Sequence, residues 1–126
     1  MIPERYAPHA YALMRIVFGL MFLTYGLQKF GLAGGTQVPM FGLMGAAAVI
    51  EVVAGVLIAV GLLTRPAAFI SSGEMAVAYF MTHEPNGALP IQNGGIPAVL
   101  FCFGFLYMAA RGSGIMSIDA GRVRSR

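Results

Sequence analysis

Long apolar runs, separated by short stretches rich in glycine, proline and polar residues, make up most of this chain. A helix needs about 20 mostly apolar residues to cross a membrane, and a shorter run fits where the bilayer thins or a flanking arginine reaches the surface. The runs predict membrane-spanning helices over about residues 9–30, 40–63, 66–83 and 96–111. We therefore expect an all-α integral membrane protein, a four-helix bundle in one domain over residues 1–126, with an amphipathic or flexible basic tail over 112–126.

Composition points the same way. Hydrophobic residues make up 58% of the 126 positions and charged residues 10%, against about 25% charged in soluble domains. The net charge of +3 does not indicate a nucleic-acid partner, because the basic residues are dispersed at the ends of the apolar runs. Cys102 is the single cysteine, so neither an internal disulfide nor a C-x-x-C dithiol can form.

The basic residues also predict the orientation. Lys29 alone falls on one side of the membrane, and the arginines fall on or near the other: Arg5, Arg15, Arg65, Arg111, Arg122, Arg124 and Arg126. An excess of basic residues marks the cytoplasmic side, so both termini are expected in the cytoplasm. The arginines of the tail suit an anionic leaflet, and membrane lipids are expected partners.

Two carboxylates interrupt the apolar runs, at a cost of about 2.5–3.5 kcal/mol for each lone charge. Glu51 lies on a seam of small residues that repeats every four positions and should face other helices. No cation is expected at its depth. Glu51 is therefore either a functional group on a proton, ion or substrate path, or a structural one.

Glu74 has a predicted partner. At 1.5 Å per residue, Arg15 and Glu74 lie about 10 and 12 Å from the cytoplasmic ends of their spans, so the sequence predicts a structural ion pair between them. If so, Glu74→Gln should lower the melting temperature, and Glu51→Gln should leave folding nearly intact.

Polar residues gather towards the other end of the spans, under the turn-rich loop 84–95. They predict a pocket in which Glu51 and His83 exchange protons as catalytic groups. The candidate substrate-binding residues are Gln28, Lys29, Tyr79 and Asn93. His83 could instead be an ordinary interfacial residue. At 100° per residue, Glu74 and Tyr79 point about 140° apart, so the polar groups of this helix cannot all line one narrow cavity. No metal or haem motif is present, and neither group is expected.

Taken in order, several segments resemble the DoxX family of small bacterial membrane proteins over roughly residues 10 to 120. They are Arg15-Ile-Val-Phe-Gly19, Gly26-Leu-Gln28-Lys29-Phe30, the Glu51 helix ending in Gly61-Leu-Leu-Thr-Arg65, Gly73-Glu74-Met75, Ala78-Tyr79-Phe80 with His83, Asn93-Gly94-Gly95, and Ser117-Ile-Asp119. The resemblance implies four transmembrane helices in the bacterial inner (plasma) membrane. It also implies kinship with the membrane subunit of thiosulfate:quinone oxidoreductase and with proteins of thiol and oxidative stress.

On this basis we expect a membrane subunit of a quinone-linked oxidoreductase, whose pocket accepts a quinone or a small sulfur compound and whose electrons come from a partner redox subunit. Two other classes stay open: a non-enzymatic scaffold or assembly factor, and a small permease acting as a homo-oligomer. One departure bears on activity, because Ile96 stands where relatives often carry an acid after Asn93-Gly94-Gly95.

Overall fold

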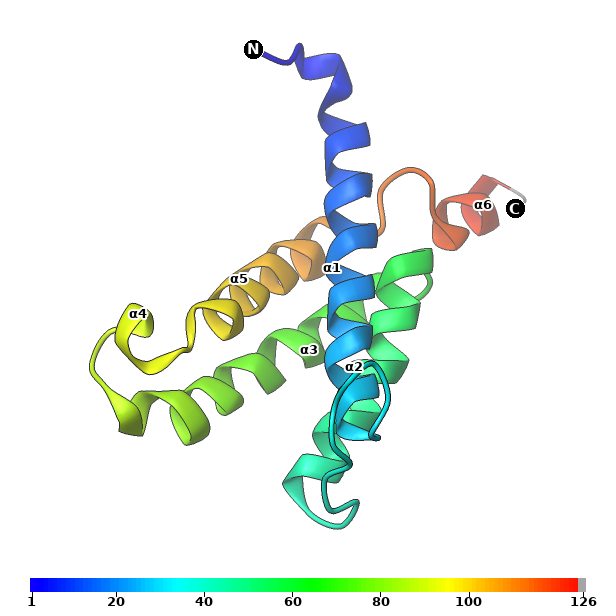
Figure 1. The fold of residues 1–126 in the computed structure, drawn as a ribbon. Coiled ribbons are helices and arrows are strands. Elements are labelled where there is room, and N and C mark those ends of the chain that lie inside the picture. Colours follow the sequence, from blue (N-terminus) through cyan, green and yellow to red (C-terminus); the bar gives the residue numbers. More distant parts are fainter. Residues whose placement is uncertain (125–126) are drawn as a thin grey trace.

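The computed structural model describes residues 1–124, with backbone only for the last two of these, and its secondary structure in that range consists of helices joined by loops, without a strand. The α-helices are α1 (Ala7–Lys29), α2 (Leu43–Val60), α3 (Thr64–Ala78), α4 (Pro90–Asn93), α5 (Ile96–Arg111) and α6 (Ile118–Arg124) (Figure 1). Short 3₁₀ turns cover Glu4–Tyr6 and Glu84–Asn86. The predicted all-α fold is confirmed. Arg126 of the predicted basic tail lies outside the described residues.

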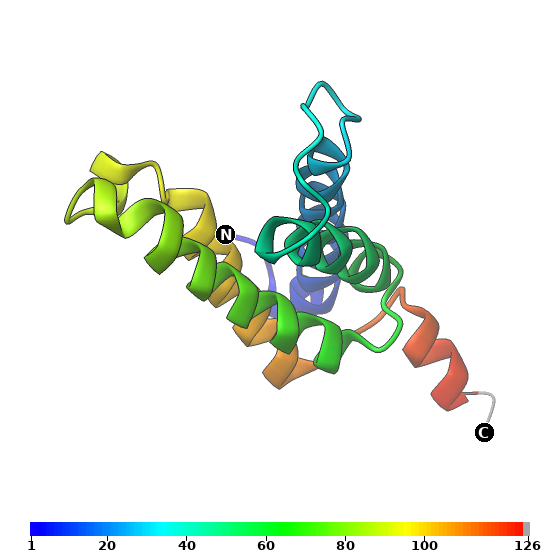
Figure 2. The same cartoon turned by 90° about the horizontal axis from the view of Figure 1, so that it is seen from below.

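The helices are arranged as two pairs. α1 packs along α2, and α3 packs along α5, while α2 and α3 are joined by a short turn and share a smaller contact. The α3–α5 pair leans away from the α1–α2 pair, so the two pairs meet near the turn between α2 and α3 and diverge towards α4 and the loop after α1 (Figures 1 and 2). The first turns of α1 extend beyond the end of α2.

Glycine decides how closely α1 and α2 approach. A Cβ atom on Gly19 would lie 2.5 Å from the backbone nitrogen of Ala59, and one on Gly55 would lie 2.7 Å from that of Leu23. Neither position can carry a side chain without separating the helices, as at other close helix contacts in lipid. The two helices therefore run in backbone contact.

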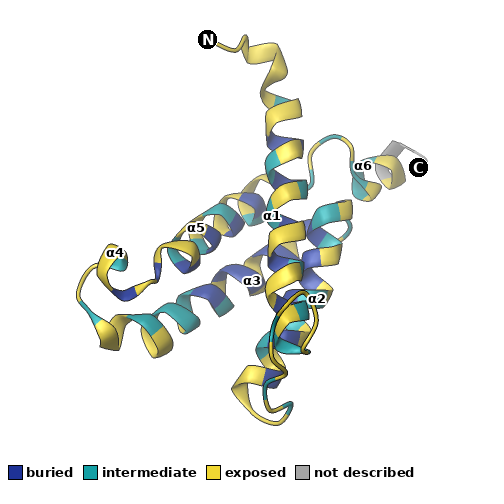
Figure 3. Ribbon diagram, viewed as in Figure 1, coloured by how far each residue is buried: buried dark blue, intermediate teal, exposed yellow. Residues whose placement is uncertain are grey.

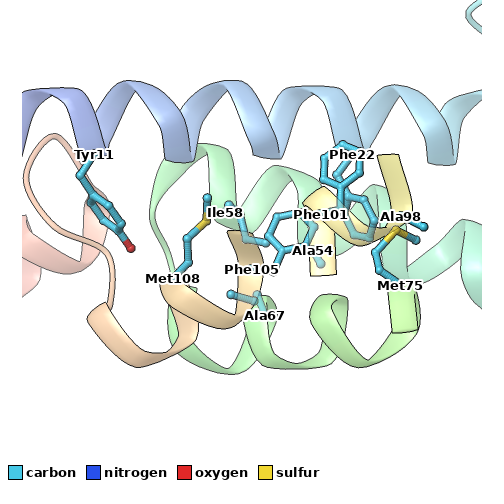
Figure 4. Packing of buried hydrophobic residues seen from close by; sticks show 11 residues of the cluster. Tyr11, Phe22, Ala54, Ile58, Ala67, Met75, Ala98, Phe101, Phe105 and Met108 are labelled. Carbon is cyan, nitrogen blue, oxygen red and sulfur yellow. The ribbon is translucent and has the colours of Figure 1, made fainter. Parts of the chain in front are cut away.

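An apolar core fills the region where the pairs meet, and the buried positions follow the facing sides of the helices (Figure 3). Phe22 of α1 and Phe105 of α5 are both fully buried, with ring centroids 4.8 Å apart. Small residues of α2, α3 and α5, among them Ala54, Ala67 and Ala98, let these rings fit between the pairs (Figure 4). Four helices thus share one core.

Two helical stretches are long and apolar enough to cross a membrane, Glu4–Lys29 and Leu43–Val60. α5 is a shorter apolar helix. The helix expected over 66–83 is interrupted, because α3 ends at Ala78 and continues as a wider π-helical turn over Tyr79–His83. This turn changes which way His83 points.

Candidate functional site

A cavity of about 370 Å³ lies between the two helix pairs. Most of its wall is apolar, from residues such as Met44, Met75 and Phe101. Its charged and polar side chains come from α1, α2, α3 and the turns after α3: Lys29, Glu51, Glu74, Thr82 and His83. Its volume is within the usual range of ligand pockets, about 300–1,000 Å³.

Glu51 and Lys29 form an ion pair across the α1–α2 seam. The Lys29 ammonium donates to Glu51 Oε1 at 3.0 Å and Oε2 at 2.8 Å. Glu51 is 2% exposed, and the Lys29 side chain keeps 20% of its surface. Gly26 brings α1 close to α2 at this level, and helical side chains lean towards the N-terminus, so Lys29 leans back along α1 onto Glu51. The expectation that Glu51 has no cation at its depth is therefore wrong.

Glu74 is the unpaired member of the cavity. Both of its carboxyl oxygens are buried, and neither has a hydrogen-bond partner among the described residues. It lies beside Glu51, close enough for the two carboxyls to share a proton, and it also interacts electrostatically with Lys29. It also lines a second hollow of about 430 Å³ between α2 and α3. A buried polar group without a partner is costly, so the Glu74 carboxyl is placed to bind a proton or a ligand.

The predicted Arg15–Glu74 ion pair is wrong. Arg15 is fully buried and donates only to backbone carbonyls, which belong to the end of α2 and to the segment after α5. The acceptors are Ile58, Ala59, Ser113, Ile115 and Met116.

Arg15 and Glu74 lie at different depths, and the depth of Arg15 cannot be counted from the start of the first span. α1 extends past the bundle, so Arg15 lies level with the last turn of α2, whose carbonyls have no partner within the helix. Glu74 lies ten residues into α3, about 15 Å from that level at 1.5 Å per residue.

A second charged residue, Asp119, fixes the segment after α5 to the bundle; it belongs to a segment that resembles the family, but no local pattern assigns it a partner. Asp119 accepts hydrogen bonds from the backbone nitrogens of Leu63 at 3.2 Å and Thr64 at 3.3 Å, and its own nitrogen donates to Gly61 O at 2.9 Å. The carboxylate thus caps the start of α3 from 55 residues away. A cap supplied by a distant segment leaves no local spacing pattern in the sequence.

His83 faces the cavity with a defined tautomer. Its Nδ1 lies 3.2 Å from the Asn93 backbone oxygen, and because a carbonyl oxygen only accepts, Nδ1 carries the hydrogen. In the neutral ring Nε2 is then an acceptor. A straight α-helix would place Glu74 and His83 about half a turn apart; the π-helical turn rotates His83 towards the face of Glu74.

The remaining predicted binding residues lie elsewhere. Tyr79 and Asn93 bond each other, with Asn93 Nδ2 donating to the Tyr79 hydroxyl at 3.2 Å and to Gly87 O at 3.1 Å. They hold the 84–95 loop and do not line the cavity. Gln28 lines a neighbouring groove of about 510 Å³. Of the predicted site residues, the cavity therefore unites Lys29, Glu51 and His83 with Glu74.

No group of three or more metal-ligating side chains comes together within residues 1–124. The charged groups that the cavity does hold are one ammonium and two carboxyls, with an imidazole beside them. This set can bind hydrogen-bonding groups and exchange protons.

A helical protein whose long apolar helices enclose a charged cavity is a membrane protein in character, and comparison with known proteins agrees. The DoxX family profile matches residues 10–84. An uncharacterized protein of Haemophilus influenzae is 40% identical over 124 residues, an alignment that covers 92% of each chain. The chain belongs to the DoxX family. No solved structure matches it.

Proposed function

We propose that this DoxX protein is a membrane subunit of a quinone-linked oxidoreductase, of the thiosulfate:quinone type, and that its interhelical cavity receives the quinone head group. The observation that carries the proposal is the buried Glu74 carboxyl, unpaired beside the Lys29–Glu51 ion pair. The cavity is the right size for a small head group, and its walls are mostly apolar.

The hydrogen-bonding capacity of the cavity suits both redox states of a quinone. An ammonium has three donors, and Lys29 directs two contacts at Glu51, which leaves one for a quinone oxygen. The acceptor Nε2 of His83 and the carboxyl of Glu74 suit the hydroxyl hydrogens of a quinol. Reduction of a quinone takes up two electrons and two protons; Glu74 and His83 are the groups we assign to proton exchange, while Glu51 holds Lys29 in place.

Electrons come, in this proposal, from a partner redox subunit. One cysteine cannot form a dithiol, so the chain's own contribution is binding, orientation and proton exchange. A small sulfur compound is the alternative occupant of the same cavity.

We also propose the membrane arrangement that the helices support. α1, α2, α3 and α5 span the bacterial inner membrane, with both termini in the cytoplasm, because Lys29 is the sole basic residue at the other end of the spans. α6 and its arginines then lie at the cytoplasmic surface.

The test is to isolate the protein with its native lipid and quantify extracted quinone by mass spectrometry. Quinone should accompany the wild-type protein in near-stoichiometric amount and should fall severalfold in Glu74→Gln. Glu84→Gln is the matched control, since Glu84 is an exposed acid outside the cavity, and it should retain quinone. Phospholipid and companion proteins without quinone would instead support the scaffold. Cation or solute flux in proteoliposomes would support a permease.

A further inference from the structure

The polar cavity adjoins a second hollow of different character. The groove of about 510 Å³ lies between α1 and α5 and is walled by Phe18, Met21, Thr24, Tyr25, Gln28, Pro97, Leu100 and Phe101. Its polar side chains have partners nearby: the Thr24 hydroxyl donates to Met21 O at 2.6 Å, and the Gln28 amide donates to Ala33 O at 3.3 Å. The groove thus offers mainly apolar surface.

The two hollows share a wall. Tyr25, Pro97 and Phe101 line both of them, and the Tyr25 and Phe101 rings meet edge to face with centroids 5.8 Å apart. Lys29, at the polar end, lies 6.0 Å from the centroid of the Tyr25 ring. A molecule that lies across this ring pair therefore contacts apolar residues on one side of a single side-chain layer and charged residues on the other.

The groove also faces outwards. Met21 is 41% exposed and Leu100 is 62% exposed, so in a membrane protein both side chains contact lipid. An apolar chain can enter such a groove sideways from the bilayer, without crossing water.

We infer that the ligand is a single-chain amphiphile, with its polar head in the cavity and its apolar chain along the α1–α5 groove. The identity of the head as a quinone rests on the proposed function; the course of the chain rests on the adjoining hollows. Because the surrounding lipid is itself apolar, moving the chain from lipid into the groove gives little hydrophobic stabilisation. The chain contributes to the binding free energy through dispersion contacts with the preformed wall of the groove and because the head is held in position.

The experiment compares two probes, a dimethoxy-methyl-benzoquinone without a side chain and its decyl derivative. Their dissociation constants follow from the shift in thermal unfolding that each produces, measured by circular dichroism at fixed detergent concentration. Met21→Trp fills the groove. Leu20→Trp is its control, because Leu20 is the neighbouring exposed residue of α1 outside the groove.

Wild-type protein should bind the decyl probe roughly tenfold more tightly than the short probe, the scale that about a dozen dispersion contacts supply. Met21→Trp should reduce this ratio to about twofold or less and leave affinity for the short probe unchanged. Leu20→Trp should keep the wild-type ratio. Partition of each probe into detergent does not depend on the protein variant, so it cancels when the ratio is compared between variants.

Four results would overturn the inference. If the short probe binds and the decyl chain adds nothing, or if Met21→Trp keeps the full ratio, the chain does not lie in the groove and the proposed function stands. If decanol stabilises the protein as much as the decyl probe, the groove takes any chain without a head in the cavity. If neither quinone binds the wild-type protein, the proposed function itself fails, and with it the head group assigned here.

Discussion

Arg15 and Glu74 are both ionisable residues within apolar helices, yet they differ in whether their side chains have hydrogen-bond partners. Arg15 has no exposed surface and donates to carbonyl oxygens of two segments. Glu74 has both oxygens buried and no hydrogen-bond partner within the described residues. A charged group whose hydrogen bonds are satisfied holds structure together, whereas one left open is available to bind. The Lys29–Glu51 pair is intermediate, since it is paired but borders the cavity.

The largest effect on stability is expected for Arg15, the residue of this comparison to which we assign a structural role. Arg15→Met removes the donors of at least four carbonyl oxygens and should lower the free energy of unfolding by about 3 kcal/mol or more, because each buried acceptor left without a donor costs about 1–3 kcal/mol. Denaturant or thermal unfolding in detergent measures it. Arg5→Met, at an exposed arginine, should have little effect. Unchanged stability of Arg15→Met would contradict a structural role.

Glu51→Gln comes next. It leaves the Lys29 ammonium beside a neutral amide and should cost about 1.5–3 kcal/mol, the usual range for a hydrogen bond to a charged group. The double variant Glu51→Gln with Lys29→Met should recover part of the loss, and a double-mutant cycle gives the coupling. Additive effects would show that the two side chains do not interact.

Asp119 is expected to matter less. Asp119→Ala removes the cap from the start of α3 and should lower the free energy of unfolding by about 1 kcal/mol. Asp119→Asn, which keeps an acceptor oxygen, should lose less. Equal stability of both variants and the wild type in thermal unfolding would mean that the Asp119 cap does not stabilise the fold, and that the Arg15 and Tyr11 contacts suffice to hold the segment after α5.

The smallest effect on stability belongs to Glu74. Glu74→Gln should change the free energy of unfolding by less than about 0.5 kcal/mol, as substitutions that break no contact do, while ligand retention falls. This reverses the order predicted for Glu51→Gln and Glu74→Gln from the sequence. A loss above about 1 kcal/mol would place Glu74 among the structural residues instead.

The sequence was sufficient for helices, small-residue seams and the family, because these depend on local pattern. It was not sufficient to identify the interaction partners of the charged residues. A depth counted along each helix separately ignores that side chains lean towards the helix N-terminus. For this reason it does not predict that Lys29 pairs with Glu51. It also assumed that a charge must meet a charge, whereas Arg15 meets carbonyls of a stretch with no periodicity. The π-helical turn that rotates His83 towards Glu74 carries no sequence signal that we could use.

The attachment of the segment after α5 has a consequence for biosynthesis. Arg15 leaves the ribosome 98 to 101 residues before three of its acceptors, Ser113, Ile115 and Met116. In the proposed membrane arrangement, α1 therefore enters the membrane with a guanidinium that has only part of its final environment, and it completes that environment once the segment after α5 has been synthesised. Assembly of this bundle is completed when the segment after α5 closes onto α1, and truncation before Met116 should impair it more than loss of a segment of the same length that makes no such contact.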